Sequence, residues 1–318
     1  MDPIPGRGSV RSRVAARVSA LTLRQISAVL PPDKAWGLWV SRRIVASVME
    51  TFGPSLSGVT IDHIDDTLPD GRRVLGDWIT TTASDTESVI YYLHGSGYAV
   101  CSAHTHRRLA GWLSRLTGLP VFCPDYRLAP QHPFPAAADD IHAGWDWLRT
   151  VRGANHIVVA GDSAGGHLAV DLVLHHGAAH PTALVLFSPL VDLTFARART
   201  RERLRPDPAI RSADAARLVA MYWQGMDSTH PRLCHDLTGR ADLPPLLIQA
   251  GGTEMLAADA HHLAQNWSGD CRLQVWPDQV HVFQALPRLT PEARPAMQEV
   301  ASFIRDALAH NTVDSIAG

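Results

Sequence analysis

The chain contains almost no lysine, little cysteine and no long apolar run. Lys34 is the only lysine among 29 basic residues, so arginine carries nearly all of the positive charge. The formal net charge of −2 gives no reason to expect a nucleic acid as a partner. Because no apolar stretch reaches the length of a membrane span, the sequence predicts no integral membrane association.

The four cysteines exclude the common sulfur sites. No two of them form a Cys-x-x-Cys pair, so neither a zinc site nor a redox dithiol is indicated. Free thiols suit a reducing compartment, and Arg24 and Gln25 interrupt the only apolar stretch near the N-terminus that could resemble a secretory signal. We therefore expect a cytoplasmic protein. The cysteines are Cys101, Cys123, Cys234 and Cys271.

Strand-like and helix-like segments alternate from residue 56 onward, which predicts an α/β fold with a mostly parallel, eight-stranded sheet flanked by helices. The turn at Asp70-Gly71 predicts a hairpin and hence an antiparallel first edge. The expected strands are Gly58–His63, Arg73–Thr80, Val89–Leu93, Pro120–Tyr126, Ile157–Ala160, Ala183–Phe187, Pro245–Ala250 and Arg272–Trp276. The expected helices are Thr105–Thr117, Ala136–Thr150, Gly165–His176, Met255–Trp267 and Glu292–Ala309.

Two segments lie outside this alternation. Residues 1–8 are rich in proline and glycine and are expected to be a disordered tail. Residues 9–55 have the apolar spacing of two helices, one over Ser9–Leu30 with arginines on its opposite face and one over Asp33–Thr51. These helices either pack on the main domain or form a cap over the active site. Binding of the arginine face to a membrane surface is a third alternative.

Residues 191–240 interrupt the core, which we expect to comprise 56–190 and 241–312. A connection this long inside a compact domain is usually functional, so we interpret it as a cap insertion rather than a surface decoration. It contains an expected helix over Ala213–Trp223. Its large apolar residues Tyr222, Trp223 and Met226 fit either a pocket lining or core packing.

The strongest motif is Gly161-Asp162-Ser163-Ala164-Gly165, which stands between an apolar strand and a helix-like stretch. Strand, Gly-x-Ser-x-Gly and helix in this order describe a nucleophile elbow, a strained turn that exposes one serine hydroxyl. The flanking glycines leave room for the neighbouring strand and helix. Ser163 is therefore the candidate nucleophile.

A second motif, His94-Gly95-Ser96-Gly97, follows the strand Val89–Leu93. Acyl transfer needs N–H donors where the carbonyl oxygen becomes negative, and a glycine-rich loop of this kind supplies them. The expected donors are the backbone N–H groups of Ser96, Gly97 and Ala164. His94 and Gly95 complete the loop.

A nucleophilic serine needs a base and an orienting carboxylate, which follow it in the chain order serine, acid, histidine. Of the 17 histidines, His281 comes directly after the last expected strand, where such a base must lie. Glu254 is the first carboxylate after the preceding strand, and Asp259 is the alternative acid. His104 and His106 have the wrong spacing for one helical face, so no metal site is expected there.

These motifs, together with Asp125-Tyr126-Arg127-Leu128-Ala129-Pro130, resemble the bacterial hormone-sensitive-lipase-like (family IV) esterases over roughly residues 56–310. The resemblance implies an α/β-hydrolase fold with a helical cap. It also implies cofactor-free hydrolysis of short- to medium-chain carboxylic esters, with a small-molecule ester as the partner. Ser96 stands where the family usually has glycine, Glu254 where many members have aspartate, and Gln131 where glutamate is common.

Several further segments, among them Trp36-Gly37 and Phe52-Gly53-Pro54, resemble a mycobacterial acetyl-hydrolase branch of this family that is associated with siderophore (mycobactin) biosynthesis. This resemblance implies a role beside siderophore assembly. Acyl transfer to another acceptor, deacylation or lactone formation on a biosynthetic intermediate, and ligand binding on an inactive hydrolase scaffold remain alternatives. The sequence leaves the oligomeric state open, a homodimer included.

Overall fold

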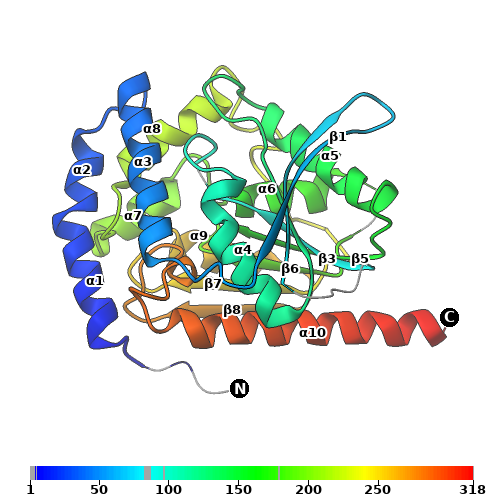
Figure 1. The fold of residues 1–318 in the computed structure, drawn as a ribbon. Coiled ribbons are helices and arrows are strands. Elements are labelled where there is room, and N and C mark those ends of the chain that lie inside the picture. Colours follow the sequence, from blue (N-terminus) through cyan, green and yellow to red (C-terminus); the bar gives the residue numbers. More distant parts are fainter. Residues whose placement is uncertain (1–3, 5, 82–86, 96, 178–179, 318) are drawn as a thin grey trace.

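An eight-stranded sheet forms the centre of the structure, a computed structural model that describes residues 4, 6–81, 87–95, 97–177 and 180–317 (Figure 1). The strand order is β1-β2-β4-β3-β5-β6-β7-β8. β1 and β2 form an antiparallel hairpin, β2 is antiparallel to β4, and every later pairing is parallel. The predicted mostly parallel sheet with an antiparallel first edge is therefore confirmed.

The strands are β1 Thr60–Thr67, β2 Arg73–Thr80, β3 Ser88–Leu93, β4 Val121–Pro124, β5 His156–Asp162, β6 Ala183–Phe187, β7 Leu246–Gly251 and β8 Cys271–Trp276. The helices are α1 Val10–Leu21, α2 Leu23–Val29, α3 Ala35–Phe52, α4 Ala103–Thr117, α5 Ala136–Thr150, α6 Ala164–His175, α7 Ala196–Leu204, α8 Ser212–Trp223, α9 Ala257–Asn266 and α10 Ala293–Ala317. A short 3-10 helix, η1, covers Phe283–Ala285.

Two apolar cores lie on opposite faces of the sheet because successive strand residues point to opposite sides. In β3, Val89, Tyr91 and Leu93 belong to the core that α5, α6 and α9 cover. Ile90 and Tyr92 of the same strand belong to the core that α4 and α10 cover. The sheet is thus buried on both faces, which leaves the carboxyl ends of the parallel strands as the place for a site.

The expected strand boundaries differ from the observed ones at the antiparallel edge. β1 begins two residues later than expected and continues to Thr67, where it pairs with Arg73 across the hairpin turn. The turn uses Gly71 at φ 87°, a backbone conformation that glycine adopts without steric cost. β4 ends at Pro124, two residues before the expected end.

The N-terminal region departs from the expected single helix over Ser9–Leu30. The helix breaks at Thr22 into α1 and α2, and the apolar stripe of α1 faces outward rather than into the protein. The exposed fractions of Val10 and Leu21 are 68% and 78%. The small residues Ser12 and Ala15 are buried instead. The exposed stripe consists of Val10, Val14, Val18 and Leu21.

Polar contacts explain which face of α1 turns inward. The Glu292 carboxylate accepts hydrogen bonds from the backbone N–H of Ser9 and, at 2.5 Å, from the hydroxyl of Ser12. The pKa of Glu292 is lowered, because these hydrogen bonds outweigh the opposing effect of burial. A buried carboxylate needs such donors, so this anchor decides the orientation of the helix.

Parts of the segment before α1 contact the main body. Gly8 is buried, and its backbone N–H donates to the carboxylate of Asp278 at 3.1 Å. Ile4 packs against the apolar cluster around Trp276. Residues 1–3 and 5, the rest of the expected tail, lie outside the described residues.

The expected insertion over residues 191–240 contains two helices instead of one. α8 confirms the predicted helix. α7 was not predicted, because its alternating arginines leave no apolar helical pattern in the sequence. Ala198 of α7 and Val219 of α8 are buried in the same core as α5 and α6, so the insertion packs directly on the main body.

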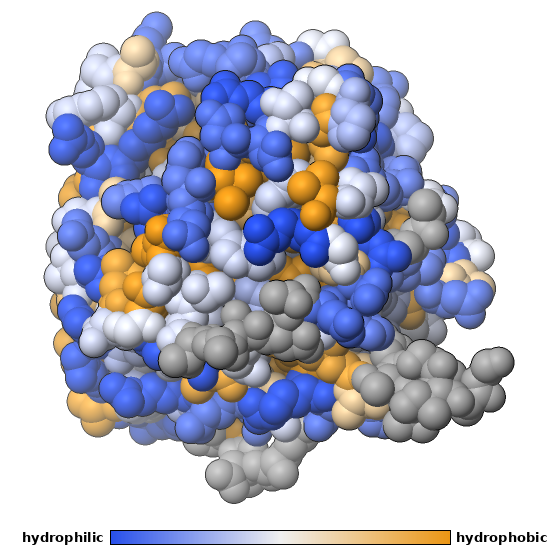
Figure 2. Space-filling view, turned by 45° about the vertical axis from the view of Figure 1, so that its right-hand side comes forward, coloured by the Kyte–Doolittle hydropathy of each residue, from blue (hydrophilic) through white to orange (hydrophobic). Residues whose placement is uncertain are grey.

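All four cysteines are free, and Cys123 is fully buried in β4 as predicted. On the face in Figure 2, apolar side chains are scattered among polar ones. Within the part of the chain that the structure describes, no helix combines the length and apolar character that a bilayer crossing requires.

We expect Glu292→Ala to release α1. The Ser9 and Ser12 donors lose a charged acceptor, which should lower the free energy of unfolding by about 1–3 kcal/mol and speed tryptic cleavage after Arg13 or Arg17. Thermal denaturation and N-terminal sequencing of the fragments measure both effects. Glu50→Ala on the exposed surface of α3 is the matched control, and equal cleavage of the two variants would contradict the anchoring role.

Candidate active site

Ser163 follows the last residue of β5 and immediately precedes α6. Its backbone has φ 51° and ψ −120°, a strained conformation that costs about 1–3 kcal/mol for a non-glycine residue. Two backbone hydrogen bonds of 3.0 Å hold it, from the N–H of Ser163 to Phe187 O and from the N–H of Leu190 to Ser163 O. A Cβ on Gly165 would lie 1.9 Å from Leu93 O, so only glycine permits this close approach of helix and strand. The turn has the geometry of the predicted nucleophile elbow.

Glu254 and His281 meet at the same edge of the sheet. Glu254 lies just after β7 with no exposed surface, and its Oε2 accepts a 2.5 Å hydrogen bond from His281 Nδ1. Oε1 accepts from the Ser188 hydroxyl at 2.7 Å and from the N–H of Gly251 at 2.6 Å. The N–H of Val282 in turn donates to the Ser188 oxygen at 3.0 Å. The carboxylate is therefore fully hydrogen-bonded although it is buried.

The strand register brings this group to the elbow. Asp162 at the end of β5 pairs with Phe187 at the end of β6. Ser163 and Ser188 therefore leave the sheet as neighbours, one beyond each strand. Ser163, Glu254 and His281 therefore lie at the same edge of the sheet, beyond the carboxyl ends of β5, β7 and β8. Ser188 itself was not predicted, because a single serine after a strand carries no motif.

The pKa of His281 is raised above its ordinary value of 6.5. Burial alone would lower it, but the negative charge of Glu254 and the hydrogen bond from the imidazole to this carboxylate outweigh that effect. The side chain of His281 remains 27% exposed, so its other ring nitrogen is not sealed in the core. A histidine in this setting can accept a proton and keep it in a stabilised form.

Asp259, the alternative acid, is used elsewhere. Its Oδ2 accepts hydrogen bonds from the N–H groups of Val191 at 2.8 Å and Asp192 at 2.9 Å. Burial raises the pKa of Asp259 to about 6. Asp259 therefore holds the loop after β6, and Glu254 is the acid that contacts His281.

The glycine-rich loop lies against the elbow and the insertion. Gly97 has φ 54°, and a Cβ there would lie 2.7 Å from Leu218 Cδ2 of α8. Gly95 leaves no room for a side chain either, since its Cβ would lie 2.0 Å from Asp162 Oδ2. Ala164, another expected donor, is buried at the start of α6. Ser96 lies outside the described residues.

Asp162 positions this loop, a role that the sequence did not predict. Its buried Oδ1 accepts hydrogen bonds from the Tyr92 hydroxyl at 2.7 Å and from the N–H of Gly95 at 2.9 Å, and His106 Nε2 lies 3.4 Å away. Burial opposes ionisation, yet His106 and the hydrogen bonds keep the pKa of Asp162 below its ordinary value. One signal was available: an acid directly after a buried strand must find donors nearby.

His94 is a structural part of the loop. The hydroxyl of Tyr126 donates to His94 O at 2.7 Å, and the two rings stack with centroids 4.2 Å apart. Burial lowers the pKa of His94 to about 3, so the ring is neutral.

Of the three adjacent residues Asp125, Tyr126 and Arg127, Tyr126 is the one that braces the loop. Asp125 instead accepts from the N–H of Ala103 at 2.7 Å, at the start of α4. Arg127 forms an exposed ion pair with Asp140 of α5 at 2.7 Å. The bracing comes from the residue with a long aromatic side chain, which can reach beneath the loop.

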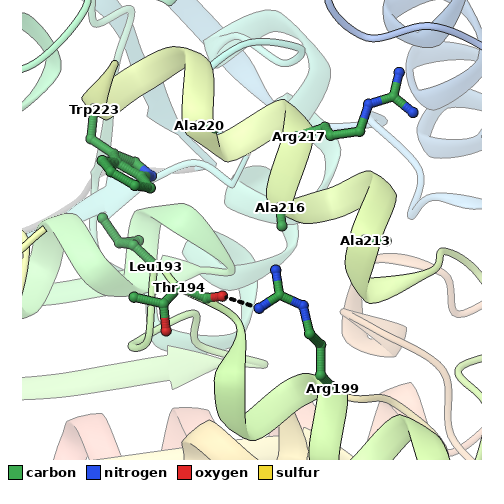
Figure 3. A pocket seen from close by; sticks show the side chains of 8 residues that line it. All are labelled: Leu193, Thr194, Arg199, Ala213, Ala216, Arg217, Ala220 and Trp223. Carbon is green, nitrogen blue, oxygen red and sulfur yellow. Dashed lines mark hydrogen bonds between the residues drawn. The ribbon is translucent and has the colours of Figure 1, made fainter. Parts of the chain in front are cut away.

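The insertion carries a cavity of about 480 Å³ between the loop after β6 and α8 (Figure 3). Trp223 lines it, Tyr222 is buried against Tyr98 with rings 3.8 Å apart, and Met226 is 39% exposed. In Figure 3 the Arg199 guanidinium reaches toward Ala216 and donates to Thr194 O, whereas Arg217 points away. The lining residues are Leu193, Thr194, Arg199, Ala213, Ala216, Arg217, Ala220 and Trp223.

The insertion contacts the glycine-rich loop through another face of α8. Leu218, which a Cβ on Gly97 would meet, lies on the opposite side of α8 from the cavity-lining Ala213, Ala216 and Ala220. α7 also contacts the acid loop, because Arg201 donates to Glu254 O at 2.8 Å and to Gly252 O at 2.9 Å. Within the described residues, no grouping with metal-ligand spacing includes Ser163, Glu254 or His281.

Residues 90–285, which contain the elbow, the loop and the acid–histidine pair, match the model of one protein family, described as the alpha/beta hydrolase fold. The match spans more than half of the chain. The chain belongs to the α/β-hydrolase family. The expected fold class, drawn first from a resemblance, is thereby confirmed.

Curated relatives of this α/β hydrolase are esterases. It is 35% identical over 237 residues to esterase LipU of Mycobacterium tuberculosis, covering 71% of this chain and 80% of the relative. It is 36% identical over 242 residues to the carboxylesterase/phospholipase LipF of the same species, with coverage of 72% and 64%. An acetyl-hydrolase of Streptomyces hygroscopicus is 35% identical over 242 residues, with coverage of 73% and 79%.

Solved structures agree with these relatives. An esterase of the bacterial hormone-sensitive lipase family superimposes with a TM-score of 0.80 at 28% identity, covering 94% of this chain and 98% of the other. An esterase/lipase from an uncultured bacterium gives 0.81 at 28% identity, with coverage of 95% and 99%. This α/β hydrolase is accordingly a hormone-sensitive-lipase-like carboxylic-ester hydrolase.

The pH profile of this α/β hydrolase should follow His281. Protonated histidine cannot accept a proton, so kcat/KM should fall as the pH drops through the pKa of His281, with a midpoint above 6.5. Glu254→Gln removes the charge that raises this pKa, so the midpoint should move down and kcat should fall about 10⁴-fold. Initial rates from pH 5 to 9 measure both.

Asp259→Asn is the control for that profile, because this acid binds backbone N–H groups and not the imidazole. Its midpoint should match the wild type. An unchanged midpoint in Glu254→Gln, or a shifted one in Asp259→Asn, would contradict the assignment of the acid.

Asp162→Asn should weaken the hold on the glycine-rich loop. The Tyr92 and Gly95 donors lose a charged acceptor, so we expect kcat to fall toward the ~10²–10³-fold loss that follows removal of one oxyanion donor, with KM little changed. Asp140→Asn, on the exposed pair with Arg127, should keep wild-type kcat. Equal kcat values for both variants would argue against a positioning role for Asp162.

Proposed function

We propose that Ser163, His281 and Glu254 form a catalytic triad for two-step acyl transfer to water. Ser163 attacks the ester carbonyl while His281 takes its proton, and Glu254 stabilises the imidazolium and its tautomer. His281 then returns the proton to the departing alcohol. Water releases the acyl group from Ser163 by the same proton transfers in reverse order.

The oxyanion that forms in each step is bound by the N–H groups of Ser96, Gly97 and Ala164. Three features support Gly97 and Ala164 as donors: the positive φ of Gly97, the start of α6 at Ala164, and the anchoring of the loop by Asp162. The N-terminus of α6 adds its positive dipole end at the place where negative charge develops.

One observation carries this proposal. The 2.5 Å hydrogen bond between His281 and Glu254 joins a base to a fully buried acid, at the sheet edge where a serine with positive φ leaves its strand. A general base needs such an acid, which fixes its tautomer and stabilises its protonated form. A ligand-binding protein on an inactive scaffold would have no reason to keep all three groups.

The substrates are short- to medium-chain carboxylic esters. Relatives named acetyl-hydrolase and carboxylesterase support this range. Residues 9–55 and 191–240 act as the cap over this site, and the chemistry uses no cofactor.

The biological role is proposed on the sequence resemblance alone. The N-terminal segments that resemble the siderophore-associated branch favour action on an acetylated or acylated intermediate of siderophore (mycobactin) assembly in the cytoplasm, where the four free thiols would persist. The same triad would also serve an acyltransferase, a deacylase or a lactonase. Product analysis with an added alcohol or amine acceptor separates transfer from hydrolysis.

We expect turnover of p-nitrophenyl esters to be highest between acetyl and octanoyl chains, and Ser163→Ala to lower kcat by about 10⁵–10⁶-fold. A fluorophosphonate probe should label the wild type at Ser163 and leave Ser163→Ala unlabelled. Ser188→Ala distinguishes the nucleophile from its neighbour, since this variant should still be labelled. Labelling of Ser163→Ala, or none of the wild type, would refute the proposed nucleophile.

A further inference from the structure

A group of histidines surrounds one buried carboxylate beside α6, on the segment that follows Ser163 in the chain. Asp171 and His175 are four residues apart on α6 and therefore share a face. His235 reaches them from the end of the insertion, more than sixty residues along the chain. One ligand atom from each of the three lies within 4.8 Å of the other two.

The imidazoles have free nitrogen atoms at this place. The ring nitrogens of His235 are shielded from solvent, and neither contacts the side chain of another residue by a hydrogen bond. His175 Nε2 lies 3.2 Å from Pro231 O, a contact in which the nitrogen must donate. Nδ1 of His175 then keeps its lone pair. Metal-bound histidines typically have this arrangement, with one ring N–H donated to a backbone carbonyl.

The Asp171 carboxylate is held in place by two basic side chains. Arg232 donates to both oxygens of Asp171 at 3.0 Å, and His142 Nε2 lies 3.2 Å from Oδ2. Each carboxylate oxygen has two lone pairs, so Oδ1 can accept from Arg232 and still bind an ion.

A further imidazole packs against the group. His167 stacks on His235 with centroids 4.1 Å apart, and its own Nδ1 is buried without a hydrogen-bond partner.

We propose that Asp171, His175 and His235 bind a divalent transition-metal ion of the Zn²⁺ type, with water in the fourth position. Two imidazoles and one carboxylate are a donor set that suits this class of ion. In a tetrahedral Zn²⁺ site the ligand atoms stand about 3.3 Å apart. The three ligand atoms here lie within 4.8 Å of one another, so they must move closer together to bind the ion. His175 and His235 are only half-buried, and rotation of their side chains supplies that movement.

The ion would link the insertion to the helix that follows the nucleophile. His167 lies between His235 and the glycine-rich loop and packs edge-on against Tyr98, with ring centroids 6.0 Å apart. Tyr98 directly follows Gly97. The proposed metal site is thus a structural site behind the glycine-rich loop. It takes no part in the ester chemistry, since it shares no residue with the proposed triad.

The test uses full-length protein without a histidine tag, freed of metal by a chelator. Zn²⁺ titrated by calorimetry should bind one ion per chain and raise the Tm, and Co²⁺ should give the visible absorption bands of a four-coordinate site. His235→Gln should lower the affinity by more than the 10–100-fold that loss of an outer hydrogen-bond partner costs. His175→Gln should act in the same way.

The neighbouring His176→Gln is the matched control, because His176 pairs with Asp146 at 2.9 Å and should leave Zn²⁺ affinity unchanged. Cys234→Ser should also retain binding. The proposal is overturned if the wild type binds no Zn²⁺, if His235→Gln binds it as tightly as the wild type, or if Cys234→Ser abolishes binding. Circular dichroism of each variant confirms that a lost site is not a lost fold, and ester turnover tests the triad separately.

Discussion

The buried carboxylate of Glu254 is the contact on which the arrangement of the site depends. It has no exposed surface, so every lone pair left without a donor would cost free energy. Its donors come from three separate places: Ser188 after β6, Gly251 at the end of β7, and His281 after β8. One side chain thus joins the ends of three strands. The geometry of the base follows from the need to satisfy a buried charge.

Asp162 plays the corresponding part on the other side of Ser163. It collects a hydroxyl from β3 and an N–H from the glycine-rich loop, as Glu254 collects donors from the strands beyond. The proposed nucleophile therefore stands between two buried carboxylates. One orients the base, and the other holds the loop proposed to bind the oxyanion. Preorganisation of both by hydrogen bonds means that little rearrangement is needed when charge develops during the reaction.

The sequence predicted the parts of this structure that depend on local pattern. Strand–glycine–serine–helix spacing indicated the elbow at Ser163, and alternation of strands and helices indicated the sheet. It could not predict contacts that depend on distant partners. Ser188 and Asp162 act through residues far along the chain, and no motif marks them. The inward face of α1 could not be predicted either, because Glu292, about 280 residues away, outweighs the apolar stripe of the helix.

Arg201 connects the insertion to the loop that carries Glu254 through hydrogen bonds to two backbone carbonyls. Because both acceptors are backbone carbonyls and not carboxylates, this contact fixes the path of the main chain. Any displacement of α7 must therefore either break these hydrogen bonds or move the loop that carries Glu254. The position of the insertion and the position of the proposed acid are thus coupled through the main chain.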